Sequence, residues 1–229
     1  RASMPILEHL TELRDRLVRA IIALAVGVVI GTFLTPRVLT VLVAPLGDLT
    51  PIAIAPTETP AVYFKVSLVI GLVIAMPVIV YQLFRFVAPG LEAQEKRYLF
   101  IGTPVAAASF AAGVGFAALV LIPAAMPFLR GFLTGIVEQR YSINEYVSFV
   151  STVLLWAGLV FETPLVMFFL AKLGVATPGG FAKARRFVII GAAAGAAVIT
   201  PTTDPVNMLL IMGPFLLLYE LGIVLARLA

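Results

Sequence analysis

Long apolar stretches, separated by short polar or proline-rich ones, make up most of this chain. Six of these stretches are candidates for transmembrane helices, because an α-helix needs roughly 20 residues to cross a bilayer. The six cover Leu17–Leu34, Val62–Phe84, Leu99–Met126, Val147–Ala171, Phe187–Thr200 and Val206–Leu225. The pattern predicts an all-α integral membrane protein with six transmembrane helices.

The six stretches differ in length, and the fifth and sixth are expected to form short helices. Phe187–Thr200 would extend about 21 Å as a helix at 1.5 Å per residue, against a hydrocarbon core of about 30 Å. It would either thin the bilayer or form a re-entrant hairpin with the sixth stretch, and the sequence leaves both alternatives open. Leu99–Met126 is longer than a crossing requires, so this helix should tilt or project beyond the bilayer.

Prolines within or beside the apolar stretches predict bent helices, because each proline removes one backbone hydrogen bond. Kinked helices of unequal length suit a curved, cupped arrangement better than a straight bundle. These prolines are Pro77, Pro104, Pro123, Pro164 and Pro214.

The segment between the first two stretches is also fairly apolar. Residues 38–43 (VLTVLV) are expected to form a short helix in the membrane interface. Four prolines then stiffen the chain, so we expect a rigid outer cap over the bundle. They are Pro45, Pro51, Pro56 and Pro60.

The first residues, "MPILEHLTELRDRLVR" (4–19), predict an amphipathic helix ahead of the first stretch, because apolar residues recur there at helical spacing. Its charged side offers intrahelical pairs, Glu12 with Arg16 and Asp15 with Arg19. This stretch is too acidic for a signal peptide and no small-residue cleavage site follows it. Arg1 to Ser3 precede Met4, so we expect them to be left from cloning.

Composition supports a membrane protein with one domain over residues 1–229. Of the 229 residues, 61% are hydrophobic and only 12% charged, whereas soluble domains carry about 25% charged residues. The net charge of +4 is better explained by cations at the cytoplasmic helix ends than by nucleic-acid binding. There is no cysteine and one histidine, His9, so we expect no metal site and no cofactor. No GxSxG, HExxH or phosphate-binding loop indicates an enzyme.

The cations also predict the orientation. All but four of the 16 Lys and Arg residues fall on one side of the six stretches, which places both termini in the cytoplasm. The four exceptions are Arg37, Lys65, Arg130 and Arg140.

Glu162 is an acid in the middle of an apolar run, "LLWAGLVFETPLVMFFL". An ionisable group at the centre of a membrane helix costs about 2.5–3.5 kcal/mol on insertion. It could be neutral and hydrogen-bonded within the bundle, act as a proton relay, or meet a polar group of another helix. Pro164 should free a nearby carbonyl and add polarity there.

Two other acidic positions lie in loops. "FRFVAPGLEAQEKRY" (84–98) is either a solvated loop or a source of carboxylates, with Glu95 acting together with Glu12 on a cation. A ligand with two arginines would need two such acceptors, because a guanidinium pairs bidentately with a carboxylate. Asp204 in "TPTTDPVN" suits a cap for the sixth helix, with Pro205 at its first position.

Several motifs together resemble one known family, that of TatC, the polytopic core of the twin-arginine protein translocase. "HLTELRDRL" resembles the family's HLxELRxR signature, and five further motifs follow in the family's order along nearly the whole chain. They are "APL" (44–46), "APTE" (55–58), "FVAPGL" with the following "EK" (86–96), "FETP" (161–164) and "TPTTDP" (200–205).

The resemblance implies a receptor for twin-arginine signal peptides that lies in the cytoplasmic membrane and works with the single-span TatA and TatB proteins. Such proteins use the proton-motive force to export folded proteins, and we expect self-association in a receptor complex. The implied signal-binding residues are Glu12, Glu95, Arg14, Phe86, Lys96 and Arg97, with Lys96 where a second arginine can occur. Glu162 matches the family's intramembrane glutamate, and Pro45, Glu58 and Asp204 match outer-face positions.

The alternative is a small proton-coupled transporter with Glu162 as the relay. It needs a second ionisable group within the membrane, and Glu220 near the end of the sixth stretch is the candidate.

Overall fold

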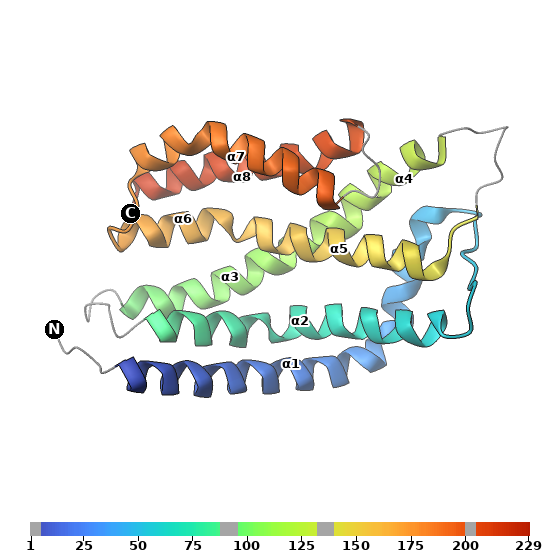
Figure 1. Ribbon diagram of the computed structural model, residues 1–229, viewed down its shortest axis with the longest axis horizontal. Helices are drawn as coiled ribbons and strands as arrows, with labels where there is room; N and C mark the ends of the chain where they lie inside the picture. Colours follow the sequence, from blue (N-terminus) through green and yellow to red (C-terminus); the bar gives the residue numbers. More distant parts are fainter. Residues whose placement is uncertain (1–5, 88–95, 132–139, 200–204) are drawn as a thin grey trace.

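The computed structural model describes residues 6–87, 96–131, 140–199 and 205–229, and all of the regular structure there is helical (Figure 1). A 3₁₀ turn, η1 (Ala44–Leu46), follows α1, and a π-helical segment, η3 (Ala117–Leu121), joins α3 to α4. The α-helices are α1 (Ile6–Val43), α2 (Glu58–Val87), α3 (Lys96–Phe116), α4 (Ile122–Gly131), α5 (Ile143–Phe161), α6 (Thr163–Lys172), α7 (Pro178–Ile199) and α8 (Pro205–Arg227). The predicted all-α class is confirmed.

Five segments of the described chain are long and apolar enough to cross a membrane. They are Leu10–Leu46, Glu58–Phe86, Ile101–Gly131, Ile143–Lys172 and Met208–Arg227. The remaining predicted crossing lies in α7, whose first half carries Lys183, Arg185 and Arg186. This helix begins at Pro178 rather than at Phe187, so its 22 residues extend about 33 Å and not the shorter length expected from the apolar run alone. The sixth predicted helix is not short either, because α8 has 23 residues.

Glycines allow α1 and α2 to pack closely. A Cβ atom on Gly27 would lie 2.4 Å from the carbonyl oxygen of Gly71, and one on Gly31 would lie 2.5 Å from that of Ser67. Gly27 and Gly31 form a G-x-x-x-G pair, the spacing that lets membrane helices approach. Thr35 and Ser67, both fully buried, share a hydrogen bond of 2.8 Å across the contact.

The expected interfacial helix at residues 38–43 does not form as a separate element. These residues continue α1, which contains Pro36 and turns behind α2 near its end (Figure 1). Leu42 and Leu46 are 6% and 0% exposed and belong to the main apolar core together with Tyr146. The Tyr146 hydroxyl donates to the carbonyl of Leu42 at 2.6 Å. The expectation failed because contacts with α5 hold one face of this segment, at Leu42, against the protein.

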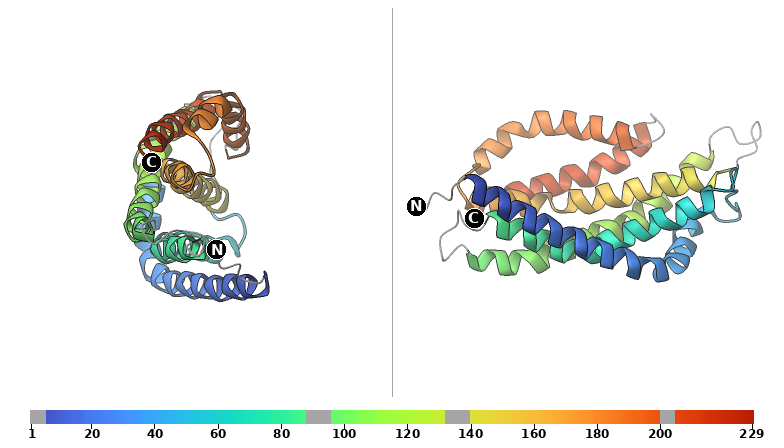
Figure 2. Two further views of the ribbon diagram at one scale, coloured as in Figure 1. Left: turned by 90° about the vertical axis from the view of Figure 1, so that its left-hand side faces the viewer. Right: turned by 60° about the horizontal axis from the view of Figure 1, so that its bottom comes forward.

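Beyond α1, the chain pairs with the segment that precedes α5. The backbone N–H of Ile52 donates to the carbonyl of Tyr141, and that of Ile143 donates to the carbonyl of Ile52, both at 2.9 Å. Seen end on, the helices follow an open arc from α1 to α7 (Figure 2). Within it α1 packs on α2, and α8 packs on both α6 and α7.

Candidate functional site

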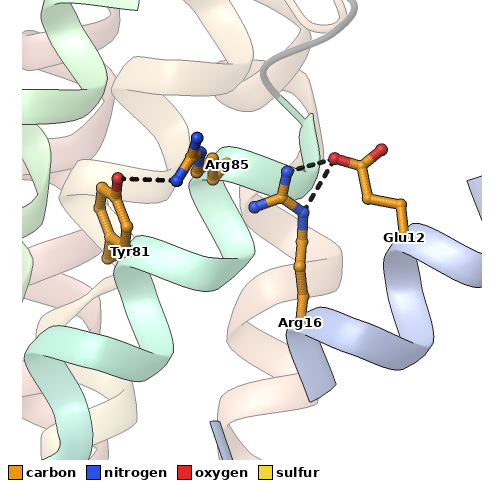
Figure 3. Close-up of polar contacts among 4 residues, drawn as sticks. All are labelled: Glu12, Arg16, Tyr81 and Arg85. Atoms are coloured by element: carbon orange, nitrogen blue, oxygen red, sulfur yellow. Dashed lines mark hydrogen bonds and ion pairs between the residues drawn. The ribbon is translucent and has the colours of Figure 1, made fainter. Parts of the chain in front are cut away.

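The beginning of α1 carries a charged pair that is largely shielded from solvent. Arg16 donates from Nε to Oε1 of Glu12 at 3.0 Å, and its Nη2 donates to the same oxygen (Figure 3). The Glu12 and Arg16 side chains are only 22% and 13% exposed. This is the intrahelical pair that the spacing predicts, on a helix that runs from the amphipathic stretch into the first span without a break.

The second predicted pair does not form. Asp15 accepts from Nε and Nη2 of its neighbour Arg14, at 3.0 and 2.9 Å, rather than pairing with Arg19. Both side chains are more than half exposed. Arg14 is therefore exposed at the surface and paired with Asp15, beside the shielded Glu12–Arg16 pair.

The end of α2 lies beside the beginning of α1 and adds another cation. Arg85 donates to the hydroxyl of Tyr81 at 3.3 Å, and its guanidinium lies 5.8 Å from the centre of the Tyr81 ring. In Figure 3, the Arg16 guanidinium points toward this end of α2. Nη1 of Arg16 is buried and has no hydrogen-bond partner in the described part of the chain. Sequence reasoning missed Arg85, although its spacing from Tyr81 is one helical turn.

The other predicted signal-binding residues are placed to different extents. Phe86 is half-buried at the end of α2. Glu95 lies outside the described residues, and Lys96 and Arg97 are described only as the first residues of α3. The beginning of α3, the end of α2 and the beginning of α1 all lie at one end of the molecule (Figure 1).

Glu162 interrupts the predicted fourth span at the junction of α5 and α6. Its backbone N–H bonds to the carbonyl of Leu159 at 3.1 Å, and its own carbonyl accepts from Val166 at 2.9 Å. Pro164, in the first turn of α6, cannot donate and so ends the regular hydrogen-bonding of α5. Oε1 of Glu162 is buried with no hydrogen-bond partner among the described residues. A buried polar atom in this state costs about 1–3 kcal/mol.

At the opposite end of the molecule, Glu58 joins the two segments of the cap. Its Oε2 accepts from the hydroxyl of Ser142 at 3.1 Å and from the backbone N–H of Ile54 at 3.2 Å. Pro45 is half-buried in η1, between the buried Leu42 and Leu46. Asp204 lies outside the described residues.

A polar cluster between α2 and α5 was not expected to be a site. Lys65 donates to Oδ1 of Asn144 at 3.1 Å and to Oγ of Ser148 at 2.5 Å. The signal in the sequence is a single cation in the apolar run "AVYFKVSLVIG", which indicates orientation but not the partners of Lys65.

Comparisons with known proteins agree on one family. A family model described as Sec-independent protein translocase protein (TatC) matches residues 8–214. The chain is 38% identical to the Sec-independent protein translocase protein TatC of Deinococcus radiodurans, over 99% of this chain and 87% of that protein. It is also 38% identical to the TatC protein of Aquifex aeolicus, over 99% and 96% of the two chains.

A solved structure agrees as well. A crystal structure of the twin-arginine translocase receptor TatC superposes with a TM-score of 0.86 at 36% sequence identity. The match covers 96% of this chain and 98% of that one.

Proposed function

Because this chain belongs to the TatC family of Sec-independent protein translocase proteins, we propose that it is the receptor subunit that binds twin-arginine signal peptides and starts the export of folded proteins. Its substrate would be the extended signal segment of a cargo protein. The proton-motive force would drive the later transport step.

The observation that carries this proposal is the shielded pair of Glu12 and Arg16. The Glu12 carboxylate already accepts from a guanidinium in a position where both side chains are mostly hidden from water. A charge-assisted hydrogen bond of this kind is stronger than one between neutral groups. A signal arginine would make the same contact, so we infer that it competes with Arg16 for Glu12.

The second signal arginine needs a second acceptor, and we assign that role to Glu95. The reason is that α3 begins at Lys96, at the same end of the molecule as Glu12. Lys96, Arg97 and Arg14 would orient the two carboxylates and repel a wrongly placed cation. Phe86 would contact the apolar part of the signal segment, because it lies half-buried beside this end of α2.

We further propose that Glu162 binds a polar group of a single-span partner of the TatA or TatB type. The Oε1 atom of Glu162 is buried and has no hydrogen-bond partner among the described residues, which favours a partner that can donate to it. In this proposal α7 forms a sixth crossing, and the open arc of helices becomes a cupped wall that receives partner helices (Figure 2). Several copies would associate in one receptor complex.

The orientation follows from the distribution of cations. Glu12 would face the cytoplasm, both termini would be cytoplasmic, and the membrane would be the cytoplasmic one. Glu58, Pro45 and Asp204 would then lie on the outer face. There Glu58 would hold the cap in the shape that the export step requires, through its bonds to Ser142 and Ile54.

A proton-coupled transporter is less well supported. Its second relay group, Glu220, accepts from Nη2 of Arg185 at 2.6 Å, and both side chains are about half exposed. In the structure this carboxylate therefore serves as the partner of a cation on α7, which leaves it a poor candidate for a second relay group beside Glu162.

Site-specific crosslinking tests the receptor function. A photoreactive residue at position 12 or 95 should crosslink to a twin-arginine signal peptide, and one at position 162 should crosslink to a single-span partner. Crosslinks of the signal peptide to position 58 but not to positions 12 and 95 would contradict the proposal.

A further inference from the structure

The Lys65 cluster is a second polar site, at the end of the bundle that also holds Glu58. The Lys65 ammonium donates to Oδ1 of Asn144 and to Oγ of Ser148, which lie one turn apart on α5. Both acceptors are neutral, and no carboxylate of the described residues forms an ion pair with Lys65. The positive charge of a residue within a membrane-spanning helix is therefore not compensated within this part of the chain.

The Lys65 cluster has hydrogen-bond donors that no described residue accepts from. An ammonium has three N–H donors, and Asn144 and Ser148 use two of them. The Ser148 hydroxyl gives its hydrogen to the carbonyl of Asn144 at 2.5 Å, so it acts only as an acceptor toward Lys65. The Asn144 amide accepts through its oxygen, and its NH₂ group donates to no described residue. One ammonium N–H and this NH₂ group can therefore bind the same anion.

The position of the Lys65 cluster along the membrane normal indicates which anion could reach it. The span Glu58–Phe86 has 29 residues, or about 44 Å, so about 7 Å would project at each end when the helix is centred on a hydrocarbon core of about 30 Å. Lys65 lies seven residues after Glu58, about 11 Å along the helix, which would place its Cα about 4 Å inside the core. A lysine side chain spans that distance and brings its ammonium to the headgroup level.

Apolar side chains next to Lys65 complete a surface suited to a lipid. Phe64 precedes Lys65, and Leu68 lies one turn deeper along α2; they are 64% and 51% exposed. An acyl chain could follow this surface into the bilayer while its headgroup remains at Lys65.

We propose that Lys65, Asn144 and Ser148 form a binding site for the phosphate of a membrane phospholipid, in the leaflet at the Glu58 end of the bundle. Phosphate oxygens would accept from the ammonium and from the Asn144 amide, and the lipid would compensate the lysine charge. A bound lipid would thereby fasten α2 to α5 beside the cap. This site is separate from the signal-peptide site and does not depend on it.

Native mass spectrometry of the purified full chain in detergent tests the site. The probes are phosphatidylglycerol and diacylglycerol with the same acyl chains, which differ by the phosphate-containing headgroup. The wild-type protein should retain phosphatidylglycerol in preference to diacylglycerol. Lys65→Met should weaken that retention by about fivefold, the effect of one cation near a membrane surface.

Two further variants keep the test decisive. Asn144→Asp preserves an acceptor for Lys65 but removes the amide donors and adds a negative charge, so it should also release the lipid even if Lys65→Met fails to fold. Arg37→Met removes an exposed cation from the outer part of α1 and should retain phosphatidylglycerol as the wild type does.

Three results would overturn the proposal. One is wild-type retention in both Lys65→Met and Asn144→Asp. Another is an equal loss in Arg37→Met, which would mean that general charge attracts the lipid. The last is displacement of the lipid by millimolar inorganic phosphate, which would assign the site to free phosphate.

Discussion

Arg16 follows Glu12 by one turn of α1, and two nitrogens of its guanidinium donate to the same oxygen of the Glu12 carboxylate (Figure 3). The acid that we assign to the signal peptide is therefore occupied by an arginine of the same helix. In the proposed binding mode a signal arginine would replace Arg16 at Glu12, so its affinity would depend on how firmly Arg16 is held.

Removing Arg16 should therefore strengthen binding. Arg16→Gln keeps a polar side chain but no longer competes for the carboxylate as a cation. Because an ion pair four residues apart on a helix contributes about 0.2–0.5 kcal/mol, the affinity for a twin-arginine peptide should rise by up to about twofold. Titration of a labelled peptide measures the change, and Arg19→Gln, an exposed cation one turn further, is the matched control. Weaker binding in Arg16→Gln would show that Arg16 orients Glu12 instead of competing for it.

Removing the carboxylate should have the opposite effect. Glu12→Gln leaves the size of the side chain unchanged but removes its charge, so binding should weaken by about 2–5 kcal/mol, as for a largely shielded charge pair. Asp15→Asn removes a more exposed acid from the same helix and should bind nearly as the wild type does. Equal losses in both variants would indicate a general effect of charge rather than a site.

The two hydrogen bonds of Glu58 should stabilise the cap. Glu58→Ala loses the bonds to Ser142 and Ile54, and each is worth about 0.5–1.5 kcal/mol. We expect a lower midpoint of thermal unfolding in detergent and faster proteolysis of the segment before α2. Asp48→Ala, at an exposed acid in the same region, should change neither. An unchanged midpoint in Glu58→Ala would mean that the apolar core alone fixes the cap.

Adding one methyl group at the close contact between α1 and α2 should destabilise the protein. In Gly27→Ala the new Cβ would lie 2.4 Å from a backbone oxygen of α2, which cannot yield without moving the helix. Overpacking of this kind costs about 1–3 kcal/mol, and a loss of folded protein on size-exclusion chromatography would report it. Gly115→Ala places a methyl group in open space on α3 and should be neutral. Full stability of Gly27→Ala would contradict the packing described here.

Much of this fold could be predicted from the sequence, because each membrane-spanning helix corresponds to a long apolar run. Helical spacing also predicted the Glu12–Arg16 pair, since both residues lie on one helix. Residues 38–43 were placed wrongly because the position of Leu42 depends on contacts with α5, which is distant in the chain. The π-helical segment at Ala117–Leu121 has no recognisable pattern in the sequence. The Lys65 cluster escaped notice for the same reason, since Asn144 and Ser148 meet Lys65 only in the folded protein.

The central claim is that two carboxylates, Glu12 and Glu95, together bind an arginine pair. The most direct measurement is the affinity of the purified protein for two signal peptides that differ only in an Arg-Arg or a Lys-Lys pair. We predict tighter binding of the Arg-Arg peptide, and a preference that shrinks in Glu12→Gln and in Glu95→Gln. Equal affinity for both peptides, or a preference untouched by either substitution, would contradict the account.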